Sequence, residues 1–261
     1  MSYLRLWSLF CLLALVSGCR SLPMAPVVSA PPKAVIPMVT PATEVEPAEP
    51  GLPAAAQVFI EPGWNLLAFA VGELNADGRR DCALVLEEAD ATKIKFTDVY
   101  TFKKANFNLR RLVVLLAEPG KFSKVFESTT TIPIASEERD PYRNDYFKSI
   151  AIKQGLLVVS YNYSTSFGSW WQGDADYKFR YESGRLRLVG NEDYTYHAGT
   201  GEGYRTSINH LTGQKKRSTV YVYPAPDDFR PTVEWSKFKP WAPLYLDEIT
   251  ELWDFHNSHP L

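Results

Sequence analysis

Residues 147–163 read FKSIAIKQGLLVVSYNY, and residues 176–194 read DYKFRYESGRLRLVGNEDY. Each stretch joins two runs rich in Val, Ile, Leu, Phe and Tyr through a short polar connection, which contains Gly155 in the first and Gly184 in the second. Such runs are typical of β-strands, and a glycine readily takes the positive φ that a tight hairpin turn requires. The two stretches therefore predict two antiparallel hairpins.

The same pattern extends outward over most of the chain from about Gln57. Short apolar runs alternate with clusters of Gly, Asp, Asn and Pro, and residues 118–120 (Glu-Pro-Gly) supply a further turn. We predict an all-β fold, either an antiparallel sandwich or an irregular propeller-like meander. The expected strands cover residues 66–71, 82–87, 98–102, 110–117, 121–127, 147–153, 156–163, 176–182, 185–194 and 218–222.

One short C-terminal helix is predicted over residues 243–255. Pro243 stands near its first turn, and Asp247 and Glu248 lie near its amino end, where helices favour these residues. One apolar face is available from Leu244, Ile249, Leu252 and Trp253. We expect this helix to pack on the sheet as a terminal cap.

Composition limits the classes of partner. The chain has 261 residues, of which 45% are hydrophobic, enough for a packed core. Lys and Arg number 28 against 30 Asp and Glu, giving a formal net charge of −2. Because there is no excess of positive charge to neutralise a phosphate backbone, we expect no nucleic-acid partner.

The amino terminus has the three parts of a secretory signal peptide over residues 1–18. Arg5 lies at the start of an apolar run, which ends in Val16-Ser17-Gly18-Cys19. This ending resembles the lipobox of bacterial lipoproteins, which implies that Cys19 is diacylated, for example with palmitate, and becomes the first residue. In such signals Arg20, rather than Asp, favours the outer membrane facing the periplasm. The alternative is an ordinary signal peptide with a chance cysteine.

Residues 19–56 are predicted to form the lipid anchor and a Pro/Ala-rich linker, and residues 57–261 the β-rich domain. Frequent prolines exclude regular structure from the linker, which reaches on the order of 100 Å if fully extended. Once the signal peptide is removed and Cys19 is acylated, Cys82 is the remaining cysteine. No intrachain disulfide is then expected, and we interpret Cys82 as a small buried residue on a strand.

A polar loop lies between the first two predicted strands. Residues 72–81 read GELNADGRRD, with oxygen-bearing side chains at alternate positions, a glycine after the third and a closing carboxylate. Calcium prefers six to eight oxygen ligands, which alternate residues of a tightly turning loop supply. The predicted calcium ligands are the side chains of Glu73, Asn75, Asp77 and Asp81 and the carbonyl of Arg79. The alternative is a simple polar hairpin turn.

This loop resembles the FG-GAP and VCBS-type repeat, whose loop runs roughly Asp-x-Asn-x-Asp-Gly-x-x-Asp between two strands. The likeness covers about 20 residues, 67–86, and departs from the pattern at Glu73, where the family has Asp. The longer side chain is expected to weaken calcium binding. The order of later segments, around residues 110–116, 147–153, 178–181 and 211–213, is similar to bacterial envelope proteins that carry a single such loop. That family has no established activity.

No catalytic motif is found in the sequence. A Gly-x-Ser-x-Gly elbow, a His-Glu-x-x-His motif and a P-loop are all absent, and His197 and His210 are too far apart in sequence to imply a shared site. Aromatic residues are concentrated between residues 161 and 181, and most of them are expected in the core. Trp170 and Trp171 are adjacent, so on a strand they point to opposite faces and at least one is exposed. Together with His197 they are candidate ligand-binding residues.

The sequence thus favours a non-catalytic, calcium-stabilised lipoprotein that binds a protein or a glycan. An envelope hydrolase, whose site assembles only in three dimensions, is the alternative, and a purely structural component is a third. A deep pocket with converging carboxylates or a histidine would favour the enzyme. A flat aromatic patch would favour the binding module.

Overall fold

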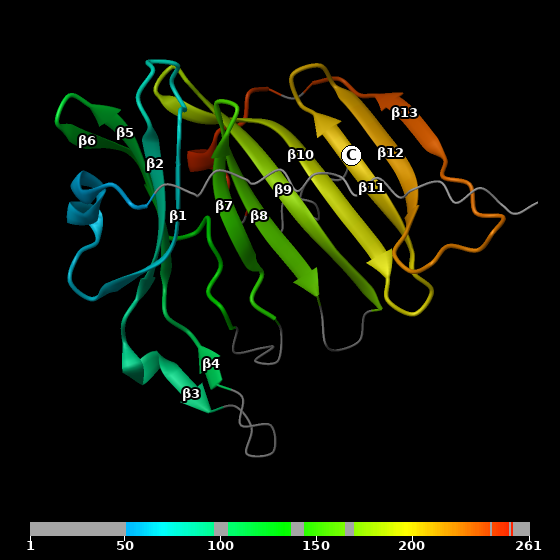
Figure 1. Cartoon of the computed structure of the whole chain (residues 1–261), viewed down its shortest axis with the longest axis horizontal. Helices are drawn as coiled ribbons and strands as arrows, with labels where there is room; N and C mark the ends of the chain where they lie inside the picture. The colour runs from blue at the N-terminus through cyan, green and yellow to red at the C-terminus, as the bar shows by residue number, and fades with distance from the viewer. Residues whose placement is uncertain are drawn as a thin grey trace, which may run out of the picture. The chain divides into compact units, whose positions relative to one another are not determined.

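Neighbouring strands are antiparallel, most of them joined as hairpins, and they build three sheets (Figure 1). The computed structural model describes residues 51–96, 104–136, 144–164, 170–240, 242–250 and 252. Strands dominate these residues, which confirms the predicted all-β class. The helical segments among them are three 3₁₀ segments, η1 (Ala54–Phe59), η2 (Ala91–Lys93) and η3 (Leu246–Glu248).

Both main sheets are antiparallel, and the larger one follows chain order without a crossover. The small sheet has the strand order β1-β2-β5-β6, with β1 (Trp64–Gly72), β2 (Asp81–Glu88), β5 (Arg110–Glu118) and β6 (Lys121–Ser128). The large sheet runs from β7 to β13, with β7 (Phe147–Lys153), β8 (Leu156–Ser164), β9 (Trp171–Glu182), β10 (Arg185–His197), β11 (Glu202–Asn209), β12 (Gln214–Tyr221) and β13 (Val233–Lys237). A small ribbon pairs β3 (Ile94–Phe96) with β4 (Lys104–Asn106).

The hairpins at Gly155 and Gly184 have the predicted turns. Gln154 and Gly155 have φ angles of 53° and 74°, and Ser183 and Gly184 have φ angles of 52° and 81°. Two successive left-handed residues make a turn whose twist matches that of the strands it joins. These turns set the pairing of β7 with β8 and of β9 with β10.

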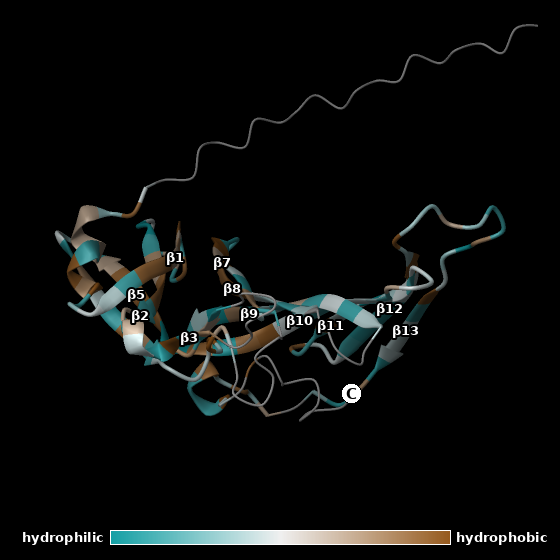
Figure 2. Cartoon of the chain, turned by 90° about the horizontal axis from the view of Figure 1, so that it is seen from below, coloured by the Kyte–Doolittle hydropathy of each residue, from teal (hydrophilic) through white to brown (hydrophobic). Residues whose placement is uncertain are grey.

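One hydrophobic core joins the two main sheets. It unites buried residues of β1, β2 and β5 with buried residues of β7 to β10, and includes the fully buried rings of Tyr161, Tyr177 and Phe179. The sheets approach closely where β1 meets β7, because a Cβ added to Gly72 would lie 2.6 Å from a side-chain carbon of Ile152. Figure 2 shows β1 and β7 as neighbours at the junction of the two sheets.

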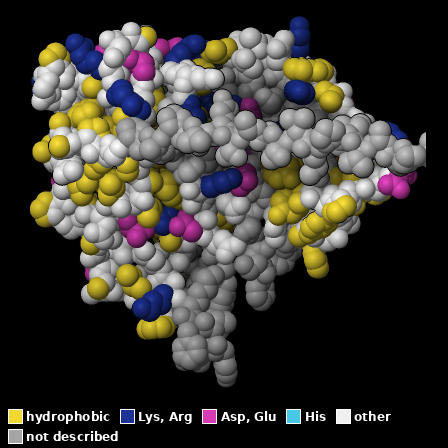
Figure 3. Space-filling model, viewed as in Figure 1, with side chains coloured by type: hydrophobic (Ala, Val, Ile, Leu, Met, Phe, Trp, Pro, Cys, Tyr) yellow, Lys and Arg dark blue, Asp and Glu magenta, His cyan; other side chains and the backbone are white. Residues whose placement is uncertain are grey.

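A second core lies on the other face of the small sheet. Cys82, Leu84 and Leu86 of β2 are fully buried there and pack with Ala56 of η1. The first six residues of β2 are therefore all buried, because this strand has a core on each of its faces. In Figure 3 hydrophobic side chains gather on the visible face around η1 and β1.

The far end of the large sheet is different, because it carries few buried residues. In β11 the buried residues are Gly203 and Ile208, and every residue of β13 is exposed. Figure 2 shows β12 and β13 at the end of this sheet away from the small sheet. This end accounts for strands that the sequence analysis missed: β11 and β13 were not predicted, and β12 begins at Gln214 instead of residue 218.

Further differences concern where β9 begins and two short strands that were not predicted. The strand β9 begins at Trp171 rather than at residue 176, because Gly173 and Ala175 continue its buried face. β3 and β4 were not predicted, and the expected strand 98–102 lies outside the described residues. So do residues 1–50, which hold the predicted signal peptide, Cys19 and most of the linker.

Of the predicted C-terminal helix, the described residues 243–250 and 252 contain the single turn η3, while residues 251 and 253–255, with Trp253, lie outside the described part of the chain. The residues before this turn pair with β10 instead: Leu188 N donates to the Leu244 carbonyl (2.9 Å), and Tyr245 forms a β-bridge with Arg187. Backbone groups used in this way cannot form helical hydrogen bonds. Leu246 and Leu252 are buried in the main core, so the segment caps the sheet as expected.

Candidate functional site

The polar loop between β1 and β2 turns its side-chain oxygens onto its own backbone amides. Glu73 Oε1 accepts hydrogen bonds from the N–H groups of Asn75 (3.1 Å) and Asp77 (3.3 Å), and Asn75 Oδ1 accepts from that of Asp77 (3.2 Å). Ala76 and Gly78 have φ angles of 59° and 79°, which let the loop turn tightly. Three of the predicted calcium ligands thus lie side by side.

Arg79 competes for the carboxylate of Asp77. Its backbone N–H donates to Asp77 Oδ1 (2.8 Å), and its guanidinium pairs with Asp77 Oδ2 (3.2 Å). The backbone hydrogen bond is the main cause that lowers the pKa of Asp77, and the guanidinium and Asn75 contribute. The sequence analysis assigned only the carbonyl of Arg79 to this loop and missed its side chain.

Asp81, the closing carboxylate, is fully buried and joins the loop to the small sheet. Its Oδ2 accepts a hydrogen bond from Leu74 N (2.7 Å), and its Oδ1 accepts one from Ala117 N in β5 (2.9 Å). Burial raises its pKa against these two hydrogen bonds, and the charges of Glu73 and Asp77 raise it further. Asp81 therefore has a structural role whether or not a cation is bound.

The donor set suits calcium in its chemistry, since it offers carboxylate, amide and carbonyl oxygens. Within the described part of the chain, however, no three His, Cys, Asp or Glu side chains form a group able to hold a metal ion. The oxygens of this loop accept hydrogen bonds from backbone amides and from Arg79. Calcium binding at this loop stays a prediction.

The three candidate ligand-binding residues lie together at the ends of β9 and β10. Trp171 pairs with His197 across the ladder, and their rings meet edge to face with centroids 5.5 Å apart. Trp170 also stacks on His197, with centroids 5.9 Å apart and an interplanar angle of 23°. Trp170 is 66% exposed and Trp171 is 47% exposed. The structure thus brings together residues that stand far apart in the sequence.

The cluster continues across the sheet to residues that the sequence analysis missed. The Trp171 ring stacks on Tyr204 of β11, with centroids 6.5 Å apart and an interplanar angle of 22°. The guanidinium carbon of Arg217 in β12 lies 3.9 Å from the centroid of the Tyr204 ring. Trp170, Trp171, His197, Tyr204 and Arg217 form one row, which we call the ring row. Only the register of four strands reveals it.

A closely packed turn holds one end of the ring row. Thr200 N donates to His197 Nδ1 (3.2 Å), and Gly201 N donates to the His197 carbonyl (2.8 Å). The Tyr223 hydroxyl donates to the Ala198 carbonyl (2.6 Å). Gly201 has a φ of 80°, and a Cβ there would lie 2.5 Å from the Tyr223 ring, so glycine is required. These contacts fix the position of His197 beside the two indoles.

A buried polar chain lies deeper on the same sheet. Asn191 Nδ2 donates to Asp193 Oδ2 (2.6 Å), which leaves Asn191 Oδ1 to accept from His210 Nε2 (2.8 Å). Burial lowers the pKa of His210 to about 4. A cavity of about 10 Å³ beside it, room for one water molecule, is lined by Arg187, Leu188, His210, Ala242, Pro243 and Leu244. We therefore assign His210 a structural role, since this space admits no larger ligand.

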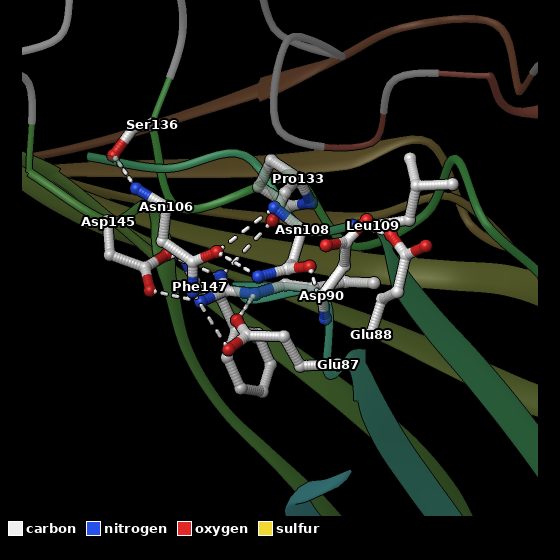
Figure 4. Close-up of polar contacts among 11 residues, drawn as sticks. Glu87, Glu88, Asp90, Asn106, Asn108, Leu109, Pro133, Ser136, Asp145 and Phe147 are labelled. Atoms are coloured by element: carbon white, nitrogen blue, oxygen red, sulfur yellow. Dashed lines mark hydrogen bonds and ion pairs between the residues drawn. The ribbon is translucent and has the colours of Figure 1, made fainter. Parts of the chain in front are cut away.

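A second buried network, around Arg110, ties the small sheet to the start of β7 (Figure 4). The guanidinium is bound by Glu87 through Nε (2.9 Å) and by Asp145 through both terminal nitrogens (2.6 Å each), and it donates to the Pro133 carbonyl (3.1 Å). Asn106 Nδ2 donates to Glu87 (2.9 Å). Every strong donor of this network has a partner, so the network is an internal fastening rather than a ligand site.

Cys82 carries a free thiol that is fully buried, and burial raises its pKa to about 12. A thiol in this state is a poor nucleophile, in line with its interpretation as a core residue.

Among the described residues, no helix has the length and apolar character needed to cross a bilayer.

Comparison of the chain with protein-family models, with curated proteins and with solved structures finds no match.

Proposed function

We propose that this protein is a lipid-anchored, periplasm-facing binding module and that its ligand is a glycan, bound at the ring row. The observation that carries the proposal is the exposure of Trp170 and Trp171 while their rings are packed on His197. Clusters of large exposed aromatic side chains in a fixed arrangement are typical of binding sites.

The packing of these rings favours binding because it lowers its entropic cost. The His197 ring contacts both indoles and is itself held by Thr200, so the side chains need little further ordering when a ligand arrives. The C–H face of a sugar ring is apolar and can stack on such an indole, while its hydroxyl groups need polar partners. Thr206 lies opposite Arg217 in register and supplies a hydroxyl group.

The remaining parts of the proposal are the anchor and the metal. A lipid at Cys19 and a linker over residues 19–56 would hold the domain on the outer membrane and let it reach away from the bilayer. A calcium ion in the loop of Glu73, Asn75, Asp77, Arg79 and Asp81 would brace the junction of β1 and β2. Neither role requires the protein to be an enzyme.

The experiment is a glycan-array measurement on the immobilised full-length protein, comparing Trp170→Ala with Trp235→Ala. The two tryptophans are equally exposed, at 66% each, but Trp235 lies on β13, away from the ring row. We expect the Trp170 variant to lose most of its glycan binding and the Trp235 variant to retain it.

Equal losses in both variants would place the site elsewhere. If the protein bound peptides but no glycan, its partner would be a protein. The glycan proposal would then be withdrawn.

A further inference from the structure

Three cations of β11 and β12, Arg205, Lys216 and Arg217, form no ion pair with a carboxylate of the described residues. Elsewhere six arginines form ion pairs: Arg79, Arg110, Arg111, Arg180, Arg185 and Arg187. By contrast, Arg205 and Arg217 lie over the rings of Tyr194 (5.6 Å) and Tyr204 (3.9 Å) and have no carboxylate within ion-pairing distance among the described residues. Lys216 likewise lies over Trp235 (5.6 Å). Their charge is available to an external anion.

Arg217 is the one of these cations that belongs to the ring row. It is exposed, and it pairs with Thr206 on one side and with Glu234 of β13 on the other. Although Glu234 is directly opposite, no ion pair joins the two, and the guanidinium rests on the Tyr204 ring instead. A stacked guanidinium uses its flat face on the ring, so its N–H groups remain directed outward in the plane.

The geometry of the row sets the size and the chemistry of what it can bind. From Trp171 on β9 to Arg217 on β12 the row crosses three strand spacings, or about 14 Å, the length of a short oligosaccharide. The N–H groups of a guanidinium match the two oxygens of a carboxylate. Because Glu234 lies beside Arg217, a singly charged carboxylate meets less repulsion there than a phosphate dianion.

We propose that the glycan bound by the ring row is acidic: a sugar stacks on the exposed indoles of Trp170 and Trp171, and Arg217 binds the carboxylate of a uronic-acid residue. This inference rests on the proposed function, because it concerns the same site. It adds the charge of the ligand and names Arg217 as the residue that selects it.

The test uses a panel of uronic-acid oligosaccharides and their methyl esters, titrated into the full-length protein by calorimetry. The ester keeps the ring and its hydroxyl groups but removes the charge. We expect the acid to bind about tenfold more tightly than the ester, as a charge-assisted hydrogen-bonded pair provides. Arg217→Gln should abolish this difference, and Arg217→Lys should restore part of it.

Arg205→Gln is the matched control, because Arg205 also stacks on a tyrosine and neighbours Tyr204 in sequence. It lies on the opposite face of the sheet, so the preference for the acid should survive. Equal binding of acid and ester by the parent protein, or binding confined to neutral glycans, would overturn the inference and leave the proposed function standing. Absence of binding to any glycan on the array would instead remove the proposed function itself. Equal melting temperatures of the variants would show that folding is unaffected.

Discussion

Arg110 and Asp145 form a two-pronged ion pair, in which Nη1 donates to Oδ1 and Nη2 donates to Oδ2, each over 2.6 Å. The Arg110 side chain is 3% exposed and that of Asp145 is 38% exposed. Burial opposes the charged form of Arg110, but Asp145 and Glu87 outweigh it and raise the pKa of the guanidinium. The pair therefore fastens β5 to the segment before β7, and so the small sheet to the large one.

We expect Arg110→Ala to lower the free energy of unfolding by about 3 to 5 kcal/mol, because Glu87 loses its buried partner. Asp145→Asn should cost under about 1 kcal/mol, since water reaches this side chain and screens the pair. Urea unfolding of both variants checks the prediction. Equal costs would mean that Arg110 is not the centre of the network.

His210 predicts a loss of stability in acid. Burial lowers its pKa to about 4 in the folded protein, whereas an unfolded histidine titrates near 6.5. The unfolded state therefore binds more protons between these values, and the free energy of unfolding falls as the pH falls from 6.5 to 4, by about 3 kcal/mol. In His210→Gln this part of the pH profile should be flat. Parallel profiles of the parent and the variant would contradict the prediction.

The polar loop predicts a stability that depends on calcium. An ion that binds the folded loop and not the unfolded chain raises the melting temperature by roughly 5 to 10 °C at about 100 times Kd. Asp77→Asn should remove the shift, and Glu73→Asp should enlarge it at a given calcium concentration. Asp77 is preferred to Asp81 for this test, because Asp81 also bonds Ala117. Melting in calcium and in a chelator gives the answer, and no shift at millimolar calcium would eliminate the metal site.

We expect alanine not to be tolerated at the position of Gly201. Its φ of 80° is unfavourable for alanine, and the added Cβ would meet the Tyr223 ring at 2.5 Å. Gly201→Ala should therefore cost at least about 1 to 2 kcal/mol and displace the turn that holds His197. Thermal melting and tryptophan fluorescence report the two effects. Gly51→Ala is the control, because nothing lies within 4 Å of its added Cβ, and a similar loss there would refute the steric explanation.

We expect Cys19 to attach the protein to the membrane. Cys19→Ala should release the protein from the membrane fraction or leave the signal peptide uncleaved, because the acyl chains have no other cysteine in the signal region after cleavage. Fractionation and mobility on a denaturing gel test this. A variant that behaves like the parent in both assays would rule out the anchor.

The amino-acid sequence by itself determined the all-β class, the hairpins at Gly155 and Gly184, and most strands that bury one face. These features depend on neighbours a few residues apart: alternation along a strand and a left-handed turn between two strands. It also pointed to Trp170, Trp171 and His197 by their composition, without placing them together. Strands such as β13 escaped prediction, because a strand exposed on both faces shows no apolar alternation.

Only the tertiary structure decided which distant residues meet. Three such contacts are that of Trp171 with Tyr204, that of Asn191 with His210, which lies in the turn after β11, and the hydrogen bond from Ala117 to Asp81. Such contacts depend on strand order and on register, where a shift of one residue turns every side chain to the other face. The C-terminal segment shows the same dependence. Its sequence favours a helix, but its backbone pairs with Arg187 and Leu188 of β10, a part of that strand that β11 does not cover. The isolated segment has no such partner.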